Sequence, residues 1–257
     1  MHTARIAELL APFLGPSAKP LPTPGHSERA LADEEPAVLS SAQLGSISTY
    51  IDLLIRWNAR VNLTAIRDPE QIVTRHFGES FFAARQLFPD LSRVGGDRER
   101  AARQGRVTGQ EKTGALAPEA FSVADVGSGA GFPGLPIKLW ASHISLTLLE
   151  SNHKKAAFLR EVSRALTLTD VNIRAVRAEA LATRLFQVVT LRAVERFARI
   201  LPAAANLVAP QGRLALLIGN AQLDQARALL PQFSWCQPET IPLSRSRVLL
   251  IGNRTES

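Results

Sequence analysis

Short apolar runs and amphipathic stretches alternate along the second half of the chain, from Phe121 onward. The runs are typical of buried strands, and the stretches carry apolar residues at helical spacing. The pattern predicts strands at 121–126, 144–149, 171–176, 187–191 and 213–218. It predicts helices at 134–141, 152–166, 194–208 and 221–230. Such alternation is typical of a parallel sheet with helices on both faces, so we expect an α/β domain over residues 120–257.

The last part of the chain departs from this alternation. Two apolar runs, 233–241 and 246–252, are separated only by a short loop at 242–245. Parallel neighbours need a long crossover, whereas antiparallel strands need only a short turn. We therefore expect an antiparallel hairpin that closes a mostly parallel sheet.

The first part of the chain contains two predicted helices. Apolar residues recur at helical spacing in 40–60, and a second helix is predicted from Asp68 or Pro69 to Phe88. Asp68 suits an N-cap, and Pro69 suits the first helical position because no helical partner exists there for an N–H. Residues 40–92 are therefore expected to form a helical segment in front of the α/β domain.

Two segments lack the apolar residues that a core needs. Residues 15–36 are rich in Pro, Ser and Ala with mixed charges, and residues 95–118 contain almost no large apolar side chain. Neither segment can bury a face. We expect residues 1–39 to be a flexible N-terminal extension and residues 93–119 to be a mobile insertion.

The composition is typical of a globular protein. The chain has 257 residues, of which 46% are apolar, so it can bury a large core. No apolar run approaches the ~20 residues of a membrane helix, and residues 1–14 lack the apolar centre of a signal peptide. The single cysteine, Cys236, excludes an internal disulfide and a cysteine metal cage. We expect a cytoplasmic protein without a metal, and nothing in the pattern requires more than a monomer.

The net charge of +7 is unevenly distributed along the chain. Residues 1–120 hold 14 basic and 14 acidic side chains, whereas residues 121–257 hold 16 basic and 9 acidic ones. A basic half that also carries the candidate site suggests a polyanionic substrate such as nucleic acid. Ordinary solubility charge spread over a surface is the alternative.

The segment from Phe121 to Pro136 combines a predicted strand, a glycine loop and a proline-marked helix start. Gly127, Gly129 and Gly131 let the backbone turn tightly and approach a ligand, because no side chain keeps the ligand away. The following helix directs unpaired N–H groups at the same place. Glu150 ends the next strand, where nucleotide-binding folds place a carboxylate for ribose hydroxyls. The chain is therefore expected to hold a nucleoside-containing cofactor.

Other residues near the loop have more than one interpretation. Asp125 is expected to steady the loop through its backbone N–H groups, and Phe132 lies where a ring could cover an adenine or a methionine-like tail. Ala178 and Glu179 follow the third strand, at the edge of the sheet where a ligand crevice lies. Position alone leaves open whether Glu179 or the backbone there meets the base of the cofactor.

Cations occur at several predicted element ends. Lys154 and Lys155 lie in the first turn of a helix, where the helix dipole disfavours positive charge. They indicate an anionic partner such as phosphate, unless they are simply solvated. Arg192 ends the fourth strand and is expected to face the crevice. Arg196 and Arg199 lie one turn apart and form either a phosphate-binding face or a solvated one.

The sequence shows no convincing nucleophile with its base. No Ser/His/Asp or Cys/His arrangement is recognisable, and Cys236 lies far along the chain from every crevice segment. His76, in the second helix, is more often a packed residue than a catalyst, and Asn62 and Thr64 suit caps and turns. A reaction that needs a cysteine nucleophile is therefore not expected.

Several segments together resemble the RsmG family, also called glucose-inhibited division protein B. The matching segments are Trp57-Asn58, 62–70, Arg75-His76-Phe77, 125–136, 148–151, 154–162 and Arg192-Ala193. The resemblance runs from about residue 40 to the C-terminus and excludes 93–119. It implies a class I methyltransferase fold with a Rossmann-like sheet, and S-adenosylmethionine as cofactor. It also implies methylation of N7 of guanine 527, in the 530 loop of bacterial 16S rRNA, with the small ribosomal subunit as partner.

The resemblance and the positions together suggest roles for particular residues. Those expected to contact or border the cofactor are Asp125, Gly127, Ser128, Gly129, Phe132, Glu150, Ser151, Ala178, Glu179 and Arg192. Those expected near RNA are Arg75, His76, Lys154, Lys155, Arg196 and Arg199. Family members often carry Lys-Gly at the end of the fifth strand, where this chain has Ile218-Gly219, so that cation is missing here.

The chemistry of guanine N7 agrees with the missing nucleophile. N7 has a free lone pair and no proton, so methyl transfer from a sulfonium needs no general base. The protein must align the reacting atoms and exclude water, and Arg192 is the expected positioning residue, at the guanine or at the cofactor. N7 lies on the Hoogsteen edge, so the guanine must be unstacked or displayed in a loop. The rival hypotheses are a nicotinamide dehydrogenase, a methyltransferase of small molecules, and an assembly factor that binds the cofactor without turnover.

Overall fold

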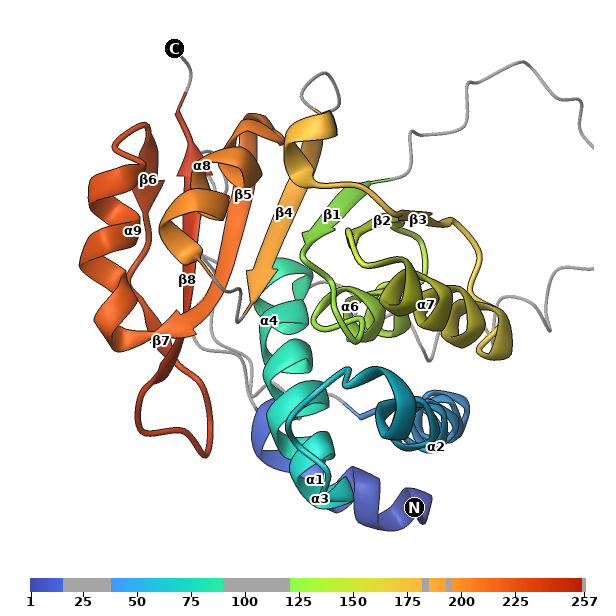
Figure 1. Cartoon of the computed structure of the whole chain (residues 1–257). Helices are drawn as coiled ribbons and strands as arrows, with labels where there is room; N and C mark the ends of the chain where they lie inside the picture. Colours follow the sequence, from blue (N-terminus) through green and yellow to red (C-terminus); the bar gives the residue numbers. More distant parts are fainter. Residues whose placement is uncertain (16–37, 90–120, 182–184, 193–195, 256–257) are drawn as a thin grey trace, which may run out of the picture.

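The computed structural model describes residues 1–15, 38–89, 121–181, 185–192 and 196–255. The predicted insertion at 93–119, and the part of the predicted extension from 16 to 37, lie outside these ranges. The described parts form an α/β domain with a group of N-terminal helices next to the carboxyl end of β4 (Figure 1).

The sheet confirms the predicted α/β fold class. Its strands are β1 Ser122–Val126, β2 Ser145–Leu149, β3 Val171–Arg174, β4 Phe186–Arg192, β5 Val208–Gly219, β6 Phe233–Trp235, β7 Glu239–Thr240 and β8 Arg247–Arg254. They follow the order β3-β2-β1-β4-β5-β8-β6, and β7 pairs with β8. Strands β1 to β5 pair in parallel, and β8 is antiparallel to β5. The order reverses between β1 and β4, and such a switch point is where open α/β sheets bind ligands.

The predicted antiparallel closure is confirmed, but its first run is divided into two strands instead of one. The run 233–241 forms two short strands, β6 and β7, and both pair with β8, which lies between β5 and β6. Pro238 lies between the two short strands, and a proline cannot donate a hydrogen bond to a neighbouring strand. The run therefore forms two separate short strands. Strand β8 pairs with both of them as well as with β5, and most of its residues are buried.

Helices cover both faces of the sheet. They are α6 Gly134–Trp140, α7 His153–Ala165, α8 Phe197–Asn206 and α9 Leu223–Leu229, with short 3₁₀ turns η3 Ala178–Leu181 and η4 Asn220–Gln222. Successive strand residues enter opposite cores: Val123 and Leu148 pack in the core with α6 and α7, whereas Ala124 and Leu149 pack in the core with α8 and α9. The two-residue period of a strand produces this sorting.

The N-terminal helices have the bounds α1 Thr3–Leu14, α2 Ser41–Val61, α3 Pro69–Gln71, the π-helical η1 Ile72–Gly78 and α4 Glu79–Leu87. The predicted helix at 68–88 is therefore present, with α3, η1 and α4 following one another directly. Asp68 is its N-cap, as predicted, because its carboxylate accepts the N–H of Gln71 at 2.8 Å. π-helical turns occur often at functional sites, and η1 contains Arg75 and His76.

The expectation that residues 1–39 are flexible was wrong for 3–14. These residues form α1, whose Ile6, Leu10 and Phe13 are fully or almost fully buried against α2, η1 and α4. The three apolar residues share one helix face, and their burial stabilises a helix that propensity alone would leave marginal.

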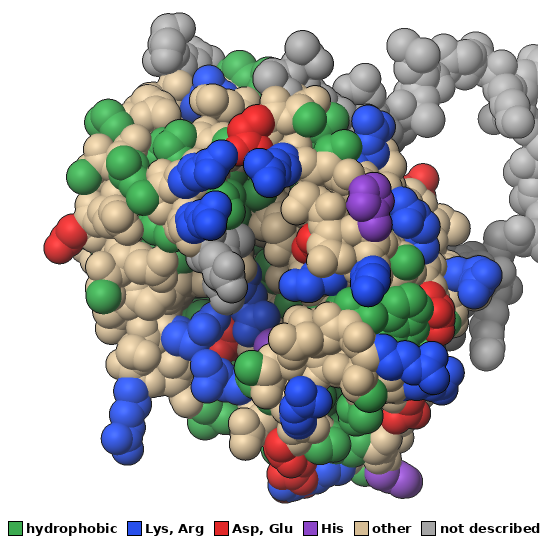
Figure 2. Space-filling view, viewed as in Figure 1, with side chains coloured by type: hydrophobic (Ala, Val, Ile, Leu, Met, Phe, Trp, Pro, Cys, Tyr) green, Lys and Arg blue, Asp and Glu red, His purple; other side chains and the backbone are tan. Residues whose placement is uncertain are grey.

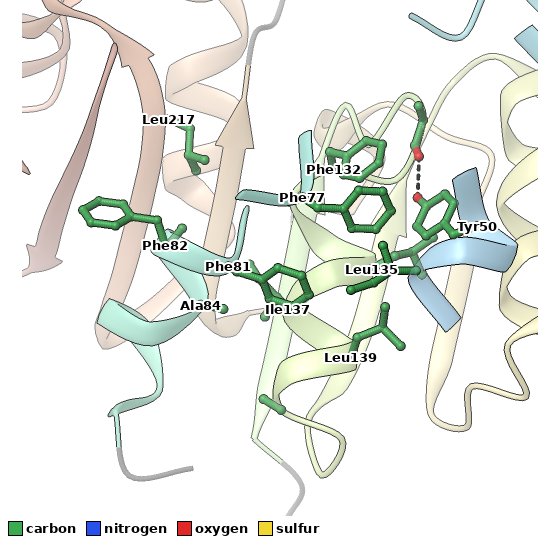
Figure 3. Packing of buried hydrophobic residues seen from close by; sticks show 14 of the residues in the cluster. Tyr50, Phe77, Phe81, Phe82, Ala84, Phe132, Leu135, Ile137, Leu139 and Leu217 are labelled. Carbon is green, nitrogen blue, oxygen red and sulfur yellow. Dashed lines mark hydrogen bonds between the residues drawn. The ribbon is translucent and has the colours of Figure 1, made fainter. Parts of the chain in front are cut away.

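The N-terminal helices and the α/β domain share one hydrophobic core. Figure 3 shows Tyr50, Phe77 and Phe81 beside Leu135 and Ile137 of α6. All five side chains are fully buried. Within the described residues, no helix is long and apolar enough to span a bilayer.

Candidate functional site

The glycine loop follows β1 at the switch point of the sheet. Gly127, Gly129 and Gly131 have φ angles of 70°, 55° and 90°, a region that favours glycine. The N–H groups of Gly127 and Ser128 both donate to the carbonyl of Leu149, at 2.9 and 3.0 Å, which ties the loop to β2. Gly127 is exposed and Gly129 is half-buried, so bare backbone faces the ligand side.

Glu150 lies directly beside the glycine loop, as its position in the sequence predicted. One carboxylate oxygen accepts the N–H of Gly129 at 2.9 Å, and the other accepts the N–H of Asn152 at 2.7 Å. These two bonds fix the carboxylate at the end of β2. A carboxylate has about four lone-pair positions, so acceptor capacity remains for a ligand.

Asp125 lies under the loop and steadies it, as expected. It is 1% exposed, and its side chain accepts the N–H of Gly134 at 3.2 Å and the hydroxyl of Thr190 at 2.8 Å. Burial raises the pKa of Asp125 to about 6, and the hydrogen bond from Thr190 opposes this. Because the side chain is enclosed by the protein and accepts both bonds from inside it, a direct contact of Asp125 with the cofactor is not supported.

Asp125→Asn tests this burial through the pH dependence of stability. The pKa of about 6 in the folded protein exceeds the ~3.9 of an unfolded aspartate, so folding favours the protonated form. The stabilising contribution is complete below pH ~4 and is lost as the pH rises through ~6. An asparagine does not titrate, so the variant does not lose this contribution. We therefore expect the free energy of unfolding of the variant, minus that of wild type, to increase by about 3 kcal/mol from pH ~4 to neutral pH. Urea titrations at several pH values measure this difference, and a constant difference would contradict it.

The faces of the Phe132 ring, which was expected to cover part of the cofactor, are packed against two side chains of the N-terminal helices. The ring stacks on Tyr50 at 5.3 Å and on His76 at 4.8 Å between centroids, and it is 5% exposed. Tyr50 also donates its hydroxyl to the carbonyl of Ala130 at 2.5 Å. The N-terminal helices therefore brace the glycine loop through Tyr50, a residue that the sequence analysis missed.

Three arginines surround one buried carboxylate, Glu79, which is 1% exposed. Nε of Arg75 lies 3.1 Å from Oε1, and Nη2 of Arg192 and Nη2 of Arg247 each lie 2.9 Å from Oε2. We call Arg75, Arg192 and Arg247 the arginine cluster. Burial lowers the pKa of Arg192 from its ordinary value, and the charge of Glu79 opposes this. Glu79 and Arg247 were not predicted from the sequence, although Arg75 and Glu79 have the spacing of a helical ion pair.

His76 orients Arg192 and is itself held by the loop between α2 and α3. It contacts the hydroxyl of Thr64 at 2.8 Å through Nε2 and Nη1 of Arg192 at 3.1 Å through Nδ1. Burial, followed by the charges of Arg192, Arg247 and Arg75, lowers the pKa of His76 to about 3. A neutral imidazole can accept from the guanidinium at Nδ1 and donate to Thr64. His76 is 8% exposed, so the structure favours this orienting role over the expected contact with RNA.

The remaining expected residues surround the same edge of the sheet. Lys154 and Lys155 do lie in the first turn of α7, but Asn152 caps their backbone N–H groups at 2.9 and 3.2 Å. Only their side chains are then available to an anion. Arg196 and Arg199 lie at the start of α8, on the other face of the sheet, and both are exposed. Of the other residues named from the sequence, Ser151 and Glu179 are exposed, and Ala178 and Ile218 are buried.

Comparison with known sequences decides the family. A sequence model of the family described as GidB, rRNA small subunit methyltransferase G, matches residues 43–92 and 113–246. The chain belongs to this family. The match includes the glycine loop, Glu79, Glu150 and Arg192, and it ends directly before Arg247.

Relatives from several bacteria align over most of the chain. Ribosomal RNA small subunit methyltransferase G of Halorhodospira halophila is 37% identical over 194 residues, which are 76% of this chain and 78% of the relative. The protein of the same name from Chloroflexus aggregans is 34% identical over 242 residues, 88% of this chain and 90% of the relative. A solved structure, ribosomal protein L11 methylase of Lactobacillus delbrueckii subsp. bulgaricus, shows 15% identity and a TM-score of 0.47 over 54% of this chain and 72% of that chain.

Proposed function

We propose that this protein is cytoplasmic and transfers the methyl group of S-adenosylmethionine to N7 of guanine 527, in the 530 loop of bacterial 16S rRNA. Membership of the family supports an rRNA of the small subunit as substrate. The observation that carries the proposal is the bare glycine backbone bonded to the Glu150 carboxylate at the switch point. The arginine cluster adds positive charge near it, at the end of the neighbouring β4.

The residues around the loop fit a nucleoside cofactor. Gly127 and Gly129 present backbone without side chains, and Glu150 retains acceptor positions for ribose hydroxyls. Ser151 and Glu179 are exposed after β2 and β3, where they can border the adenosine. When bound, S-adenosylmethionine supplies an electrophilic methyl group on a sulfonium.

Methyl transfer to N7 needs no proton transfer by the protein. Among the described residues near the loop, Asp125 already accepts two internal hydrogen bonds, and Glu79 is paired with the arginine cluster. The lowered pKa of His76, about 3, keeps its imidazole neutral. The contribution of the protein is then to align N7 with the methyl group and to keep water out. Arg192, fixed by Glu79 and His76, is the group proposed to position the reactants.

The test is a labelling experiment with the natural particle. Purified protein is incubated with S-adenosylmethionine labelled in its methyl group and with small ribosomal subunits from cells that lack the enzyme. We expect label at N7 of a single guanine in the 530 loop. Label at another nucleotide, or none despite measured cofactor binding, would overturn the assignment of this substrate.

A further inference from the structure

We propose that the arginine cluster is a binding site for a phosphodiester of the RNA substrate. Within the cluster, Arg247 is the arginine whose N–H groups have the fewest acceptors in the protein. This inference rests on the proposed function, because it concerns the side of the site that receives RNA. Glu79 is then a positioning residue that holds the three guanidinium groups before RNA arrives.

The charge balance of the cluster favours an anion. Three guanidinium groups face the single carboxylate of Glu79, and the neighbouring His76 is neutral. Asp125 also acts on Arg192 through its charge, from the loop side. Even when Asp125 is counted as ionised, positive charge exceeds negative charge. A phosphodiester carries one negative charge and would bring these groups close to neutrality.

The hydrogen-bond donors of the cluster are unequally satisfied. Arg192 donates to Glu79, to the carbonyl of Arg75 and to His76. By contrast, Nε and Nη2 of Arg247 are buried without a hydrogen-bond partner of good geometry, although Nη2 lies 2.9 Å from Glu79. Leaving buried charged donors without acceptors is costly. The side chains of Arg75 and Arg247 are 48% and 20% exposed, and the oxygens of a phosphate suit the fork of a guanidinium, so an RNA phosphate can reach the cluster from the side of these two residues.

The cluster lies on the edge of the sheet that carries the glycine loop. Arg192 is the last residue of β4, and Arg247, the first of β8, pairs with Gly219, the last of β5. Strand β4 is the direct neighbour of β1, from which the glycine loop emerges. Figure 2 shows Lys and Arg side chains gathered around an acidic side chain and a histidine in a hollow of this face. A phosphate held there would place its nucleotide on the side of the methyl donor.

The carboxylate of the methionine part of the cofactor is another anion that could reach this edge. An RNA phosphate and the carboxylate of the cofactor would lead to different effects of Arg247→Ala. Loss of a phosphate contact weakens RNA binding and leaves cofactor binding intact, whereas loss of a carboxylate contact weakens cofactor binding. Glu79 keeps Arg75 and Arg192 as partners in the variant, so we expect it to fold.

The experiment measures binding and turnover separately. The RNA probe is a hairpin with the sequence of the 530 loop, bound in fluorescence anisotropy at several salt concentrations. We expect Arg247→Ala to raise the Kd for this RNA about 10-fold to 100-fold and to reduce the salt slope by about one. The Kd for S-adenosylmethionine should stay within about twofold of wild type, because the lost donors serve the RNA and not the cofactor. Arg247→Lys, which keeps the charge without the fork, should recover part of the RNA affinity.

Arg227→Ala is the matched control, because Arg227 is exposed on α9, on the other face of the sheet from α7. It removes the same charge and should leave RNA affinity near that of wild type. Unchanged RNA affinity in Arg247→Ala, or a weakened affinity for S-adenosylmethionine, would overturn the proposal. Thermal melting verifies that each variant is folded. Binding does not require turnover, so a wild type that binds RNA through Arg247 but methylates no guanine would contradict the proposed function alone.

Discussion

Glu79→Gln is expected to lower the free energy of unfolding by about 3–5 kcal/mol, because it leaves guanidinium groups in a buried site without their carboxylate. Glu79 is 1% exposed and contacts Arg75, Arg192 and Arg247 from three separate elements: η1, β4 and β8. A glutamine has nearly the same shape, so the change removes charge and leaves the packing in place. Urea denaturation, followed by circular dichroism, measures the difference.

A surface pair in the same protein supplies the control. Glu70 is paired with Arg5 at 2.8 Å, and both side chains are more than two-fifths exposed. Glu70→Gln makes the same chemical change where water screens the charges, so the unfolding midpoint should hardly move. If Glu79→Gln were as stable as Glu70→Gln, Glu79 would not hold the cluster, and the preorganisation of the RNA side of the site would lose its basis.

Glu79→Gln should also affect catalysis in a way that simple destabilisation does not. Arg192 is fixed by Glu79 and His76, so loss of the carboxylate frees a guanidinium that is proposed to position the reactants. We expect kcat at saturating RNA to fall even at temperatures where the variant is fully folded, because the alignment of the reactants is impaired. Measurement of kcat well below the melting temperature separates the two effects.

The sequence was sufficient for features that depend on local periodicity. Strands and helices after Phe121 follow from runs and spacings that report burial directly, and the placement of Glu150 beside Gly129 follows from two strand ends in a parallel sheet. The position of β8 between β5 and β6 could not be predicted in this way. Strand order depends on which edges meet in space, and no local pattern records that.

Contacts between distant segments account for the other differences. Phe132 was expected to face the cofactor because it follows the glycine loop, but its ring is enclosed by Tyr50 and His76 from the N-terminal helices. Arg247 and Glu79 each look like surface charges in the sequence. They become a site only because β8 places Arg247 opposite the end of β5, where Glu79 lies within reach. The short apolar face of α1 was a signal that the sequence did contain.

Glu150→Ala is expected to raise the Kd for S-adenosylmethionine by about 100-fold or more, because the proposed hydrogen bonds from two ribose hydroxyls to its carboxylate would be lost together. The carboxylate also holds Gly129 at 2.9 Å and Asn152 at 2.7 Å, so the loop loses an anchor in the same change. Isothermal titration with the cofactor measures the effect. Asp224→Asn, at an exposed position of α9, removes a carboxylate away from the loop and should bind like wild type.

Glu150→Ala and Arg247→Ala together separate the two halves of the site. Glu150→Ala should weaken the binding of S-adenosylmethionine and leave the affinity for the 530-loop hairpin unchanged, because RNA binding is driven by the contacts of cations with phosphates. The second should do the reverse. If Glu150→Ala bound the cofactor normally, the nucleoside would not lie on the glycine loop, and the family's activity would need another binding site in this chain. If Arg247→Ala also lost affinity for S-adenosylmethionine, Arg247 would not serve the RNA alone, and the assignment of the arginine cluster to an RNA phosphate would be overturned.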